Sequence, residues 1–409
     1  PYTAHASIGP SCAIAQLKDG ALTVWTHSQG VFPLQRDLAK ALDMDVTKIR
    51  CIHAQGSGCY GHNGADDVAL DAALLARASN GRPVKVQWMR DDEFGWEPFG
   101  PAMTVELHGS LDDAGMIVDW THDVWTNTHS TRPQKDGCNL LASWHLAQPK
   151  SPGKPEIIPQ PAGGGDRNAI PLYDFPRQRV THHFIPQMPI RVSALRALGA
   201  YANVFAIETF MDDLAGAAKV DPVVFRMRHL SDPRAIAVVK AAATFAGWQP
   251  GLPGGTSKGR GFGFAKYKNL SAYLAVVVDV EVDRQSGQVR VTRAMAAIDA
   301  GQVINPDGLV NQTEGGIIQA VSWTLKEQVR FNNEHITSRD WSRYPILTFP
   351  DVPEIKVTLL DRPAERSLGA GEAAQGPTAA AIGNAIAHAT GIRLRDLPLM
   401  PNRIKGAFG

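Results

Sequence analysis

The carboxylate of Glu372 stands in a setting that favours chemistry. It ends a glycine-rich segment, residues 368–372, just before a predicted helix, and small residues flank it on both sides. A glutamate near a helix start also complements the helix dipole, so a structural role explains the position as well. The small neighbours, however, leave the carboxylate room to face a ligand, as a general base must. Glu372 is therefore a candidate base, with helix capping as the alternative.

A second glycine-rich loop, residues 56–64, lies between a predicted strand and a predicted helix. It reads Gly-Ser-Gly-Cys-Tyr-Gly-His-Asn-Gly. Glycines at such a junction let backbone N–H groups approach an anionic ligand at the helix N-terminus. The loop lacks the Gly-Lys-Ser/Thr of a P-loop. Residues 56–61 have the G-x-G-x-x-G spacing, but no acidic residue follows about 20 positions later, so the full Rossmann fingerprint is not met. A tight structural turn explains this pattern as well as a ligand cradle does.

Three further polar side chains lie near predicted helix starts. Arg196 stands between apolar residues in the segment 192–199. An arginine in a tight turn of small residues suits an oxygen-rich or anionic cofactor, although a structural ion pair is the more usual role. Gln29 and Gln312 are neutral donors, and each by itself is more often a helix cap or a surface amide.

The cysteines and histidines form no metal-binding or hydrolytic motif. The four cysteines include no C-x-x-C pair, which argues against a zinc site, an iron–sulfur cluster held by this chain, or a disulfide scaffold. H-E-x-x-H is absent from the sequence, which removes the familiar zinc-protease interpretation. G-x-S-x-G occurs once, at residues 255–259, inside the Gly/Pro/Ser-rich stretch and not between a strand and a helix, so it does not support a serine-hydrolase interpretation.

The elements that must position these loops alternate between strands and helices. Hydrophobic periodicity predicts strands at 21–27, 48–54, 83–89, 102–109, 115–125, 179–186, 271–283, 288–299, 326–331 and 354–361. It predicts helices at 33–43, 65–79, 203–218, 233–248 and 307–325 and a final helix at 373–390, with a further helix starting at 221–222. The fold class is therefore α+β, or mixed α/β.

A linker predicts two unequal α/β units. Residues 250–259 are rich in Gly, Pro and Ser, so we expect one unit at 1–252 and a second at 253–409. A Pro/Gly-rich stretch at about 132–177 interrupts the first unit. Its apolar residues favour a long ordered loop that covers a pocket or a partner surface over a flexible insertion. The expected anchors are Trp144, Leu146, Ile157, Ile158 and Ile170.

Length and composition exclude several classes of protein. The 409 residues include 41 Lys+Arg and 40 Asp+Glu, for a net charge of +1. Nucleic acid is therefore not an expected partner, because binding it needs a concentrated basic face. No apolar run is long enough to span a membrane. The chain begins at Pro1 without a signal peptide, so we expect a piece of something longer, and its compartment stays open between bacterial cytoplasm and periplasm.

Together these segments resemble the molybdenum-binding large subunit of the xanthine dehydrogenase and aldehyde oxidase family. The resemblance is closest to the branch with the isoquinoline 1-oxidoreductase beta subunit and the nicotinate dehydrogenase large subunit, and it follows family order along nearly the whole chain. The segments that carry it are His5–Pro10, Trp25–Gly30, Gly58–Asp67, Leu195–Gly199, Asn311–Gly315 and Gly369–Glu372. It implies the two-unit fold of such a subunit, with this chain as its C-terminal part.

The resemblance also implies a cofactor and its surroundings. The family binds molybdenum through a pyranopterin, in bacteria usually as molybdopterin cytosine dinucleotide, so no side chain here would ligate the metal directly. Glu372 matches the family's general base. The residues implied around the cofactor are Gln29, Gly58, Cys59, Tyr60, Gly61, Arg196, Gln312, Gly369, Ala370 and Gly371, and those implied in the substrate pocket are Tyr60, Asn63 and Leu198.

The implied reaction is a hydroxylation. Water-derived oxygen enters an electron-poor carbon of an N-heteroaromatic compound or an aldehyde, and two electrons leave for [2Fe–2S] clusters on a small partner subunit. The family's Gly-Gln-Gly pterin segment is absent. An upstream part of the large subunit, or a second molybdenum-binding chain, would supply it, and a cytochrome or flavin is a candidate final electron acceptor. The alternatives are an aldehyde dehydrogenase of the same family and a non-catalytic structural subunit.

Two departures from the family pattern bear on the substrate. Much of the family has an aromatic residue followed by glycine where this chain has Cys59-Tyr60, as the isoquinoline-type branch does. The bulkier Tyr60 reshapes the implied pocket, so the substrate cannot be copied from xanthine enzymes. The Arg196 loop also lacks the cysteine that the carbon monoxide dehydrogenase branch needs, which argues against that chemistry.

Overall fold

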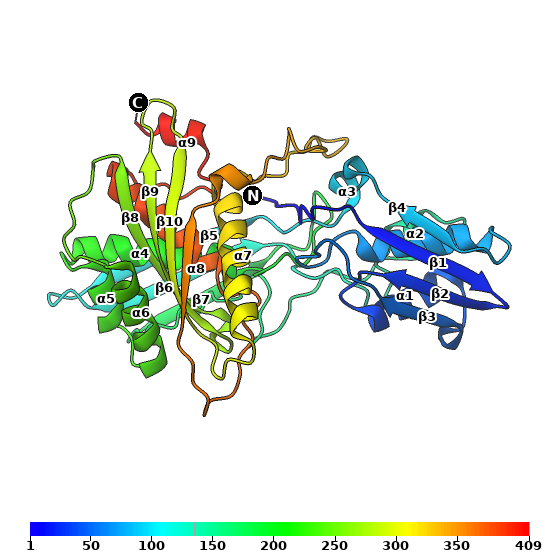
Figure 1. The fold of residues 1–409 in the computed structure, drawn as a ribbon, viewed down its shortest axis with the longest axis horizontal. Helices are drawn as coiled ribbons and strands as arrows, with labels where there is room; N and C mark the ends of the chain where they lie inside the picture. The colour runs from blue at the N-terminus through cyan, green and yellow to red at the C-terminus, as the bar shows by residue number, and fades with distance from the viewer. Residues whose placement is uncertain (135, 409) are drawn as a thin grey trace.

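The computed structural model describes residues 1–134 and 136–408, which form two lobes (Figure 1). The smaller lobe contains a four-stranded sheet in the order β3-β2-β1-β4, in which only the β2–β3 pair is parallel. Helices α1 and α2 bury their apolar side chains against this sheet. Its elements are β1 (Cys12–Lys18), β2 (Ala21–Thr26), α1 (Val31–Leu42), β3 (Ile49–His53), α2 (Ala65–Arg77), β4 (Val84–Gln87) and α3 (Arg90–Trp96).

The larger lobe contains two further sheets. One has the order β5-β6-β7 and the other the order β11-β10-β9-β8. The first half of this lobe consists of β5 (Met103–Leu111), β6 (Ile117–Thr126), β7 (Gln178–Phe184), α4 (Ala200–Ala217), α5 (Pro222–Arg228) and α6 (Pro233–Ala246). The second half consists of β8 (Lys258–Lys266), β9 (Tyr273–Val282), β10 (Val289–Asp299), α7 (Pro306–Leu325), β11 (Glu354–Leu359), α8 (Gln375–Thr390) and α9 (Pro401–Gly406).

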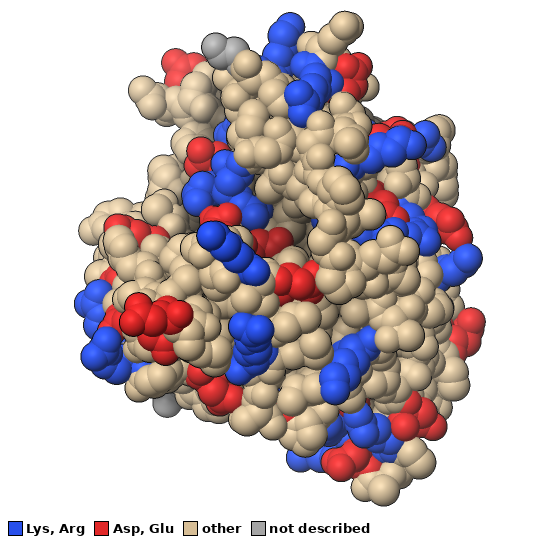
Figure 2. Space-filling model, turned by 90° about the vertical axis from the view of Figure 1, so that its left-hand side faces the viewer, with Lys and Arg blue, Asp and Glu red and all other residues tan. Residues whose placement is uncertain are grey.

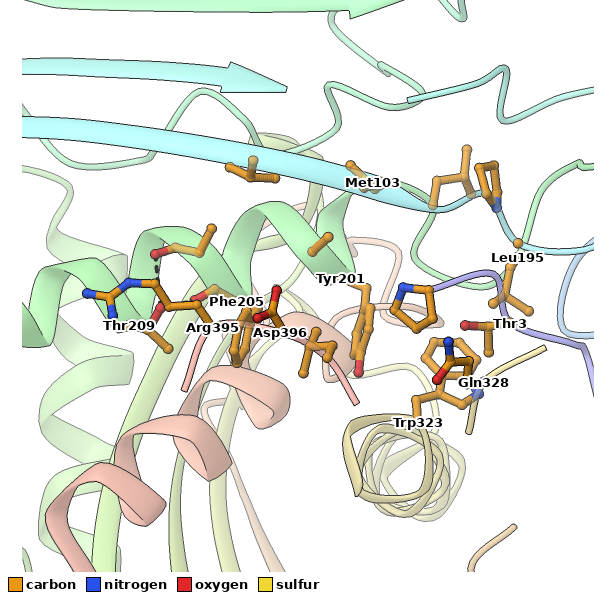
Figure 3. A pocket seen from close by; sticks show the side chains of 18 of the residues that line it. Thr3, Met103, Leu195, Tyr201, Phe205, Thr209, Trp323, Gln328, Arg395 and Asp396 are labelled. Carbon is orange, nitrogen blue, oxygen red and sulfur yellow. Dashed lines mark hydrogen bonds between the residues drawn. The ribbon is translucent and has the colours of Figure 1, made fainter. Parts of the chain in front are cut away.

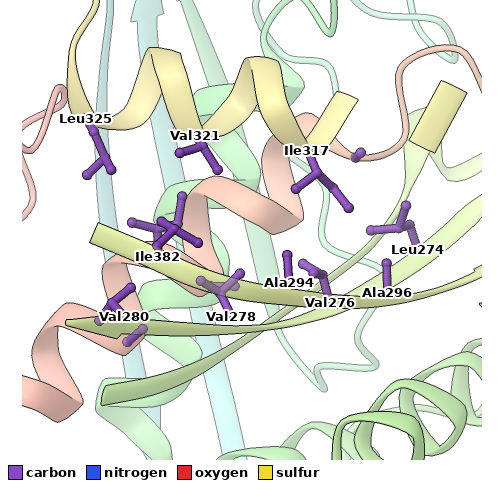
Figure 4. Close-up of a cluster of buried hydrophobic side chains, with 14 of the residues drawn as sticks. Leu274, Val276, Val278, Val280, Ala294, Ala296, Ile317, Val321, Leu325 and Ile382 are labelled. Atoms are coloured by element: carbon purple, nitrogen blue, oxygen red, sulfur yellow. The ribbon is translucent and has the colours of Figure 1, made fainter. Parts of the chain in front are cut away.

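Strand β9 carries the core of the larger lobe because both of its faces are buried. Successive side chains of a strand point to opposite faces. Val276 and Val278 therefore pack with Ile317 of α7 and Ile382 of α8 (Figure 4), whereas Val277 between them packs with the side chains of α5 and α6. Burial on both faces explains why β9 is almost continuously apolar.

Glycines let α8 lie directly on β8. A Cβ at Gly261 would lie 2.1 Å from the carbonyl oxygen of Ala381, and one at Gly259 would lie 2.0 Å from that of Ala385. The sequence prediction ended a linker at Gly259 and placed the next strand at 271–283, so it missed β8, whose first residue is Lys258. A glycine-rich strand marks this close approach of two backbones.

Two other predictions for the C-terminal half are wrong. No strand forms over 326–331; Phe331 makes only an isolated bridge with Ile336. Helix α8 begins at Gln375 instead of residue 373, and it is not the final helix, because α9 follows it. The mixed α/β class itself is confirmed.

The division at residue 252 stays a prediction. Buried side chains from both proposed units share one hydrophobic core, in which Val239 of α6 and Val277 of β9 take part. Of the long segment at about 132–177, the described residues 132–134 and 136–177 form a loop between β6 and β7, as predicted, with one short 3-10 helix at Leu141–His145. The Trp144 indole donates a hydrogen bond to the Cys138 carbonyl (2.8 Å). Two of the expected anchors fail, because Ile157 and Ile170 are 46% and 42% exposed.

Charged side chains are mixed over the face shown in Figure 2, which lies at the left-hand side of Figure 1. Lysines and arginines alternate there with acidic residues, and no broad area of one sign is visible. This face therefore offers no concentrated basic surface of the kind that nucleic-acid binding requires. Among the helices of residues 1–134 and 136–408, none is both long and apolar enough to cross a membrane.

Candidate active site

Glycine-rich turns from distant parts of the sequence meet around a cavity of about 1220 Å³. Its walls come from the segment before β1, from the loops after β2, β3 and β6, from the segment 194–198, from α7 and from the turn before α8. Both lobes therefore contribute to it. The predicted site residues that line this cavity are Gln29, Tyr60, Gly61, Arg196, Leu198, Gln312, Gly371 and Glu372.

Other predicted residues lie behind the wall. Gly58, Cys59, Gly369 and Ala370 belong to the same turns but are not part of the cavity surface. The Cys59 thiol donates to the carbonyl oxygen of His27 (3.2 Å). Burial raises the pKa of Cys59 to about 12, so this side chain stays a neutral thiol at physiological pH.

The side chain of Asn63 hydrogen-bonds the start of α2. Its side chain is 1% exposed. Its Oδ1 accepts a hydrogen bond from the amide of Ala65 (3.1 Å), the first residue of α2, and its Nδ2 donates to Ser7 Oγ (3.3 Å). These contacts satisfy an otherwise unpaired N–H at the helix start. Asn63 does not line the cavity, and its implied contact with a substrate stays a prediction.

Two backbone hydrogen bonds join the 58–61 loop to the Arg196 loop. The amide of His62 donates to the Ala194 carbonyl, and the amide of Arg196 donates to the Tyr60 carbonyl, both at 2.7 Å. A Cβ at Gly61 would lie 2.0 Å from the Ala194 oxygen, and the φ of Gly61 is +134°. Only glycine fits this close approach.

Arg196 holds the turn that precedes Glu372. Its Nε and Nη2 donate to the Gly371 carbonyl at 2.8 and 2.6 Å, and its Nη1 donates to Gln319 Oε1 at 3.0 Å. Gln312 Nε2 donates to the same Gly371 oxygen at 3.0 Å. The Gly371 carbonyl is therefore held by two groups, the Gln312 amide of α7 and the guanidinium of the Arg196 loop.

The Glu372 carboxylate is held by donors from two other segments. Its Oε1 accepts a hydrogen bond from the Ala197 amide (2.9 Å), and its Oε2 accepts one from the Tyr267 hydroxyl (2.7 Å). Helix α8 begins at Gln375 and has no side-chain cap. The Glu372 carboxylate therefore does not act as the cap of this helix. The carboxylate is oriented toward the cavity by the chain around it.

Ala197 reaches Glu372 through an unusual backbone conformation. Ala197 and Leu198 have φ angles of 74° and 50°, in the left-handed region that costs a residue with a side chain of the order of 1–2 kcal/mol. Such strain persists where the surrounding structure enforces it, often at functional sites. Here it accompanies the hydrogen bond from the Ala197 amide to the Glu372 carboxylate.

Three residues of the site were missed by sequence reasoning. Tyr267 lies just after β8, and its hydroxyl accepts a hydrogen bond from Arg167 Nη1 (2.6 Å). Arg167 is buried and also donates to the carbonyl oxygens of Ala162 and Gly163. Arg132 lines the cavity and donates from Nη2 to Gln29 Oε1 (2.8 Å). The glycine triplet at 163–165 was the only local signal, and it pointed to no partner.

Two parts of the chain match a known family description. Residues 1–149 and residues 206–353 each match a molybdopterin cofactor-binding domain. A nicotinate dehydrogenase subunit of Pseudomonas putida is 43% identical over 100% of this chain and 34% of its own length. The beta subunit of isoquinoline 1-oxidoreductase of Brevundimonas diminuta is 30% identical over 97% of this chain and 48% of its own length.

The chain belongs to the xanthine dehydrogenase family. It spans about a third and about half of the lengths of these two relatives. The crystal structure of quinoline 2-oxidoreductase from Pseudomonas putida 86 has the same fold, with a TM-score of 0.80 and 15% identity over 99% of this chain and 75% of that chain. The family is one of molybdopterin-binding oxidoreductases, as the sequence resemblance implied.

The donors that face the cavity fit a molybdopterin cofactor. Within the described residues, the amides of Tyr60 and Gly61 have no hydrogen-bond acceptor. Unpaired N–H groups and a guanidinium suit the oxygen-rich groups of a pterin. Residues 1–134 and 136–408 contain no group of three or more His, Cys, Asp or Glu side chains placed to hold a metal ion.

A second cavity of about 530 Å³ adjoins the first (Figure 3). The two share Leu195, Arg196, Leu198 and Trp323 in their walls. Tyr201 and Phe205 of α4 give the second cavity an aromatic side. The Arg196 loop is therefore a partition between two cavities.

Proposed function

We propose that this chain forms part of a molybdenum hydroxylase in which Glu372 is the general base. The single observation that carries the proposal is the convergence of Glu372, Arg196 and Gln312 on one cavity wall, in a chain of the molybdopterin-binding family. A carboxylate fixed by two donors and open to a cavity is the arrangement that proton abstraction needs.

The residues of the site have distinct tasks in this proposal. A bound molybdenum–pterin cofactor would supply the two-electron oxidation and activate a water-derived oxygen. Glu372 accepts the proton that this oxygen loses, at a carboxylate oxygen whose second lone pair is not used by Ala197 or Tyr267. Arg196 and Gln312 keep the turn at Gly371 from shifting, so the base stays in reach of its proton.

The remaining cofactor contacts are part of the proposal. Gln29, Tyr60 and Gly61 face the cavity and would contact the cofactor directly. Gly58, Cys59, Gly369 and Ala370 would act by shaping the turns that carry the wall residues. We propose the cytosine dinucleotide form of the cofactor, which the family resemblance alone supports.

Partners complete the proposed enzyme. Both relatives are named as subunits, which supports a multi-subunit assembly. We propose an upstream part of the large subunit, or a second molybdenum-binding chain, and a small subunit with [2Fe–2S] clusters. A cytochrome or flavin would accept the electrons in the end.

The substrate proposed is an N-heteroaromatic compound, with an aldehyde as the second candidate. Ile158, Ile318 and Trp323 give the cavity an apolar wall, which suits a flat ring. Leu198 and Tyr60 also line this cavity and would contact the ring. The names of the two relatives, which refer to nicotinate and isoquinoline, support the same class.

Molybdenum analysis and isotope labelling test this function on the full-length protein with its partner subunits. We expect molybdenum to co-purify with the chain and the hydroxylated product of a pyridine or quinoline ring to take its oxygen from labelled water. A preparation that holds no molybdenum, or a product whose oxygen comes from dioxygen, would contradict the proposal. Turnover of aldehydes alone would replace the first substrate class by the second.

A further inference from the structure

Arg132 carries a guanidinium with unused donors on the cavity wall. Its Nη2 donates to Gln29 Oε1 (2.8 Å). Within residues 1–134 and 136–408, no acceptor receives a hydrogen bond from its Nε or Nη1, and no carboxylate lies at ion-pair distance. A guanidinium has five N–H donors in a fixed fork. Most of the donors of Arg132 therefore remain open to a ligand.

The charge of Arg132 is only partly balanced. Burial lowers the pKa of the guanidinium below its ordinary value, and the carboxylates of Asp66 and Glu372 act in the opposite direction from beyond contact distance. A half-buried cation without a hydrogen-bonded counter-ion is unfavourable. An anion that entered the cavity would relieve this cost, because it would supply the missing acceptor.

The other arginine of the cavity cannot take this role. The donors of Arg196 are directed at Gly371 and Gln319 of the chain itself. Among the described residues that line the cavity, Arg132 is the arginine whose fork is free. An incoming anion would also meet Glu372, a like charge, and a cation nearby would offset that repulsion.

We propose that Arg132 binds the carboxylate of an anionic aromatic substrate. The planar fork of an arginine matches the two oxygens of a carboxylate. Arg132 and Glu372 line the same cavity, so a ring anchored at Arg132 lies in the cavity where the base acts. The inference rests on the proposed function in that it places the substrate beside Glu372. A phosphate of the cofactor has the same anionic oxygens and is the other source of such a ligand.

Binding of benzoate and benzamide tests this assignment without turnover. The two compounds have the same ring, and only benzoate carries a charge. Titration calorimetry on the full-length holoenzyme should show benzoate bound roughly 10- to 100-fold more tightly than benzamide, the range expected for charge-assisted hydrogen bonds. In Arg132→Gln this preference should disappear, while Arg132→Lys, which keeps the charge without the fork, should retain part of it.

Controls separate the two sources of the anion. Arg36 is an exposed arginine of α1 that does not line the cavity, so Arg36→Gln should leave the preference for benzoate intact. Melting temperature and molybdenum content of each variant show whether the site is still assembled. One combined result would assign Arg132 to the cofactor phosphate and overturn the proposal. In that result Arg132→Gln loses the cofactor, and the Arg132→Lys holoenzyme keeps the preference for benzoate at its full wild-type strength.

Two further outcomes are decisive. Equal affinity of the wild-type holoenzyme for benzoate and benzamide would overturn the inference, and so would a preference for benzoate that survives in Arg132→Gln. Because no step of this test requires catalysis, its result is independent of the hydroxylase assignment. Selective benzoate binding by a protein that hydroxylates nothing would contradict the proposed function and still support the anion site at Arg132.

Discussion

Two arginines face the same cavity, and their surroundings differ. The N–H groups of Arg196 donate hydrogen bonds to the chain itself, chiefly to the Gly371 carbonyl and Gln319. Arg132 makes one hydrogen bond, to Gln29, and leaves the rest of its fork open within the described residues. The Arg196 side is therefore closed by internal contacts that fix the base, whereas the Arg132 side is open and incomplete. The difference indicates that the Arg196 wall positions Glu372 and that the Arg132 wall recognises a ligand.

Removal of the closed side should have the larger effect. In Arg196→Gln the Gly371 carbonyl loses both guanidinium donors and keeps only the Gln312 amide, so the turn that carries Glu372 is held less firmly. We expect turnover to fall by about 10²-fold or more, since small displacements of a reacting group cost that much. The kcat at saturation for a carboxylate substrate and for its amide should fall by the same factor. A fall in kcat for the carboxylate substrate alone would mean that Arg196 recognises the carboxylate. That result would contradict the assigned difference between Arg196 and Arg132.

A smaller effect is expected from Tyr267→Phe, which sharpens the same comparison. The hydroxyl bridges Arg167 and Glu372. Its removal leaves a buried donor unpaired and should lower the free energy of unfolding by about 1–3 kcal/mol. We expect kcat to fall by about 10-fold as well, because Glu372 loses one of its two orienting donors.

Tyr201→Phe is the matched control for that variant. Tyr201 is partly buried, and its hydroxyl pairs with Thr324 Oγ1 (3.0 Å) away from Glu372. Its loss should lower stability and leave kcat nearly unchanged. Equal kcat values in Tyr267→Phe and Tyr201→Phe, measured with the denaturant midpoint of each, would make Tyr267 a purely structural residue.

The predicted part of the site lies in local motifs. Glu372, Arg196 and Gln312 each stand in a short pattern of small residues that the sequence displays directly. The missed part lies in contacts across long stretches of chain. Tyr267 and Glu372 are 105 residues apart, and Arg132 and Gln29 are 103 apart. Periodicity and turn composition carry no information about such pairs, because tertiary packing brings them together.

The errors in the fold have a similar cause. Strand β8 was missed because the linker prediction ended at Gly259 and the glycine-rich residues after it were assigned no element, while in the structure these glycines permit contact with α8. Polar and apolar residues alternate over 326–331 as in a strand, yet these residues make separate contacts and join no sheet. Lys326 pairs with Asp351, and Val329 is buried. Local propensity is overridden in both places by what packs against the segment.

The central claim is that Glu372 accepts a proton, and Glu372→Gln tests it most directly. The amide keeps the size of the side chain but cannot take up a proton, so turnover should fall by at least ~10²-fold at unchanged molybdenum content. Glu334→Gln, at an exposed loop position, is the matched control and should behave as wild type. Rate, molybdenum content and melting temperature are measured on one preparation of the full-length enzyme. Turnover of Glu372→Gln within a few-fold of wild type at full molybdenum occupancy would contradict the account.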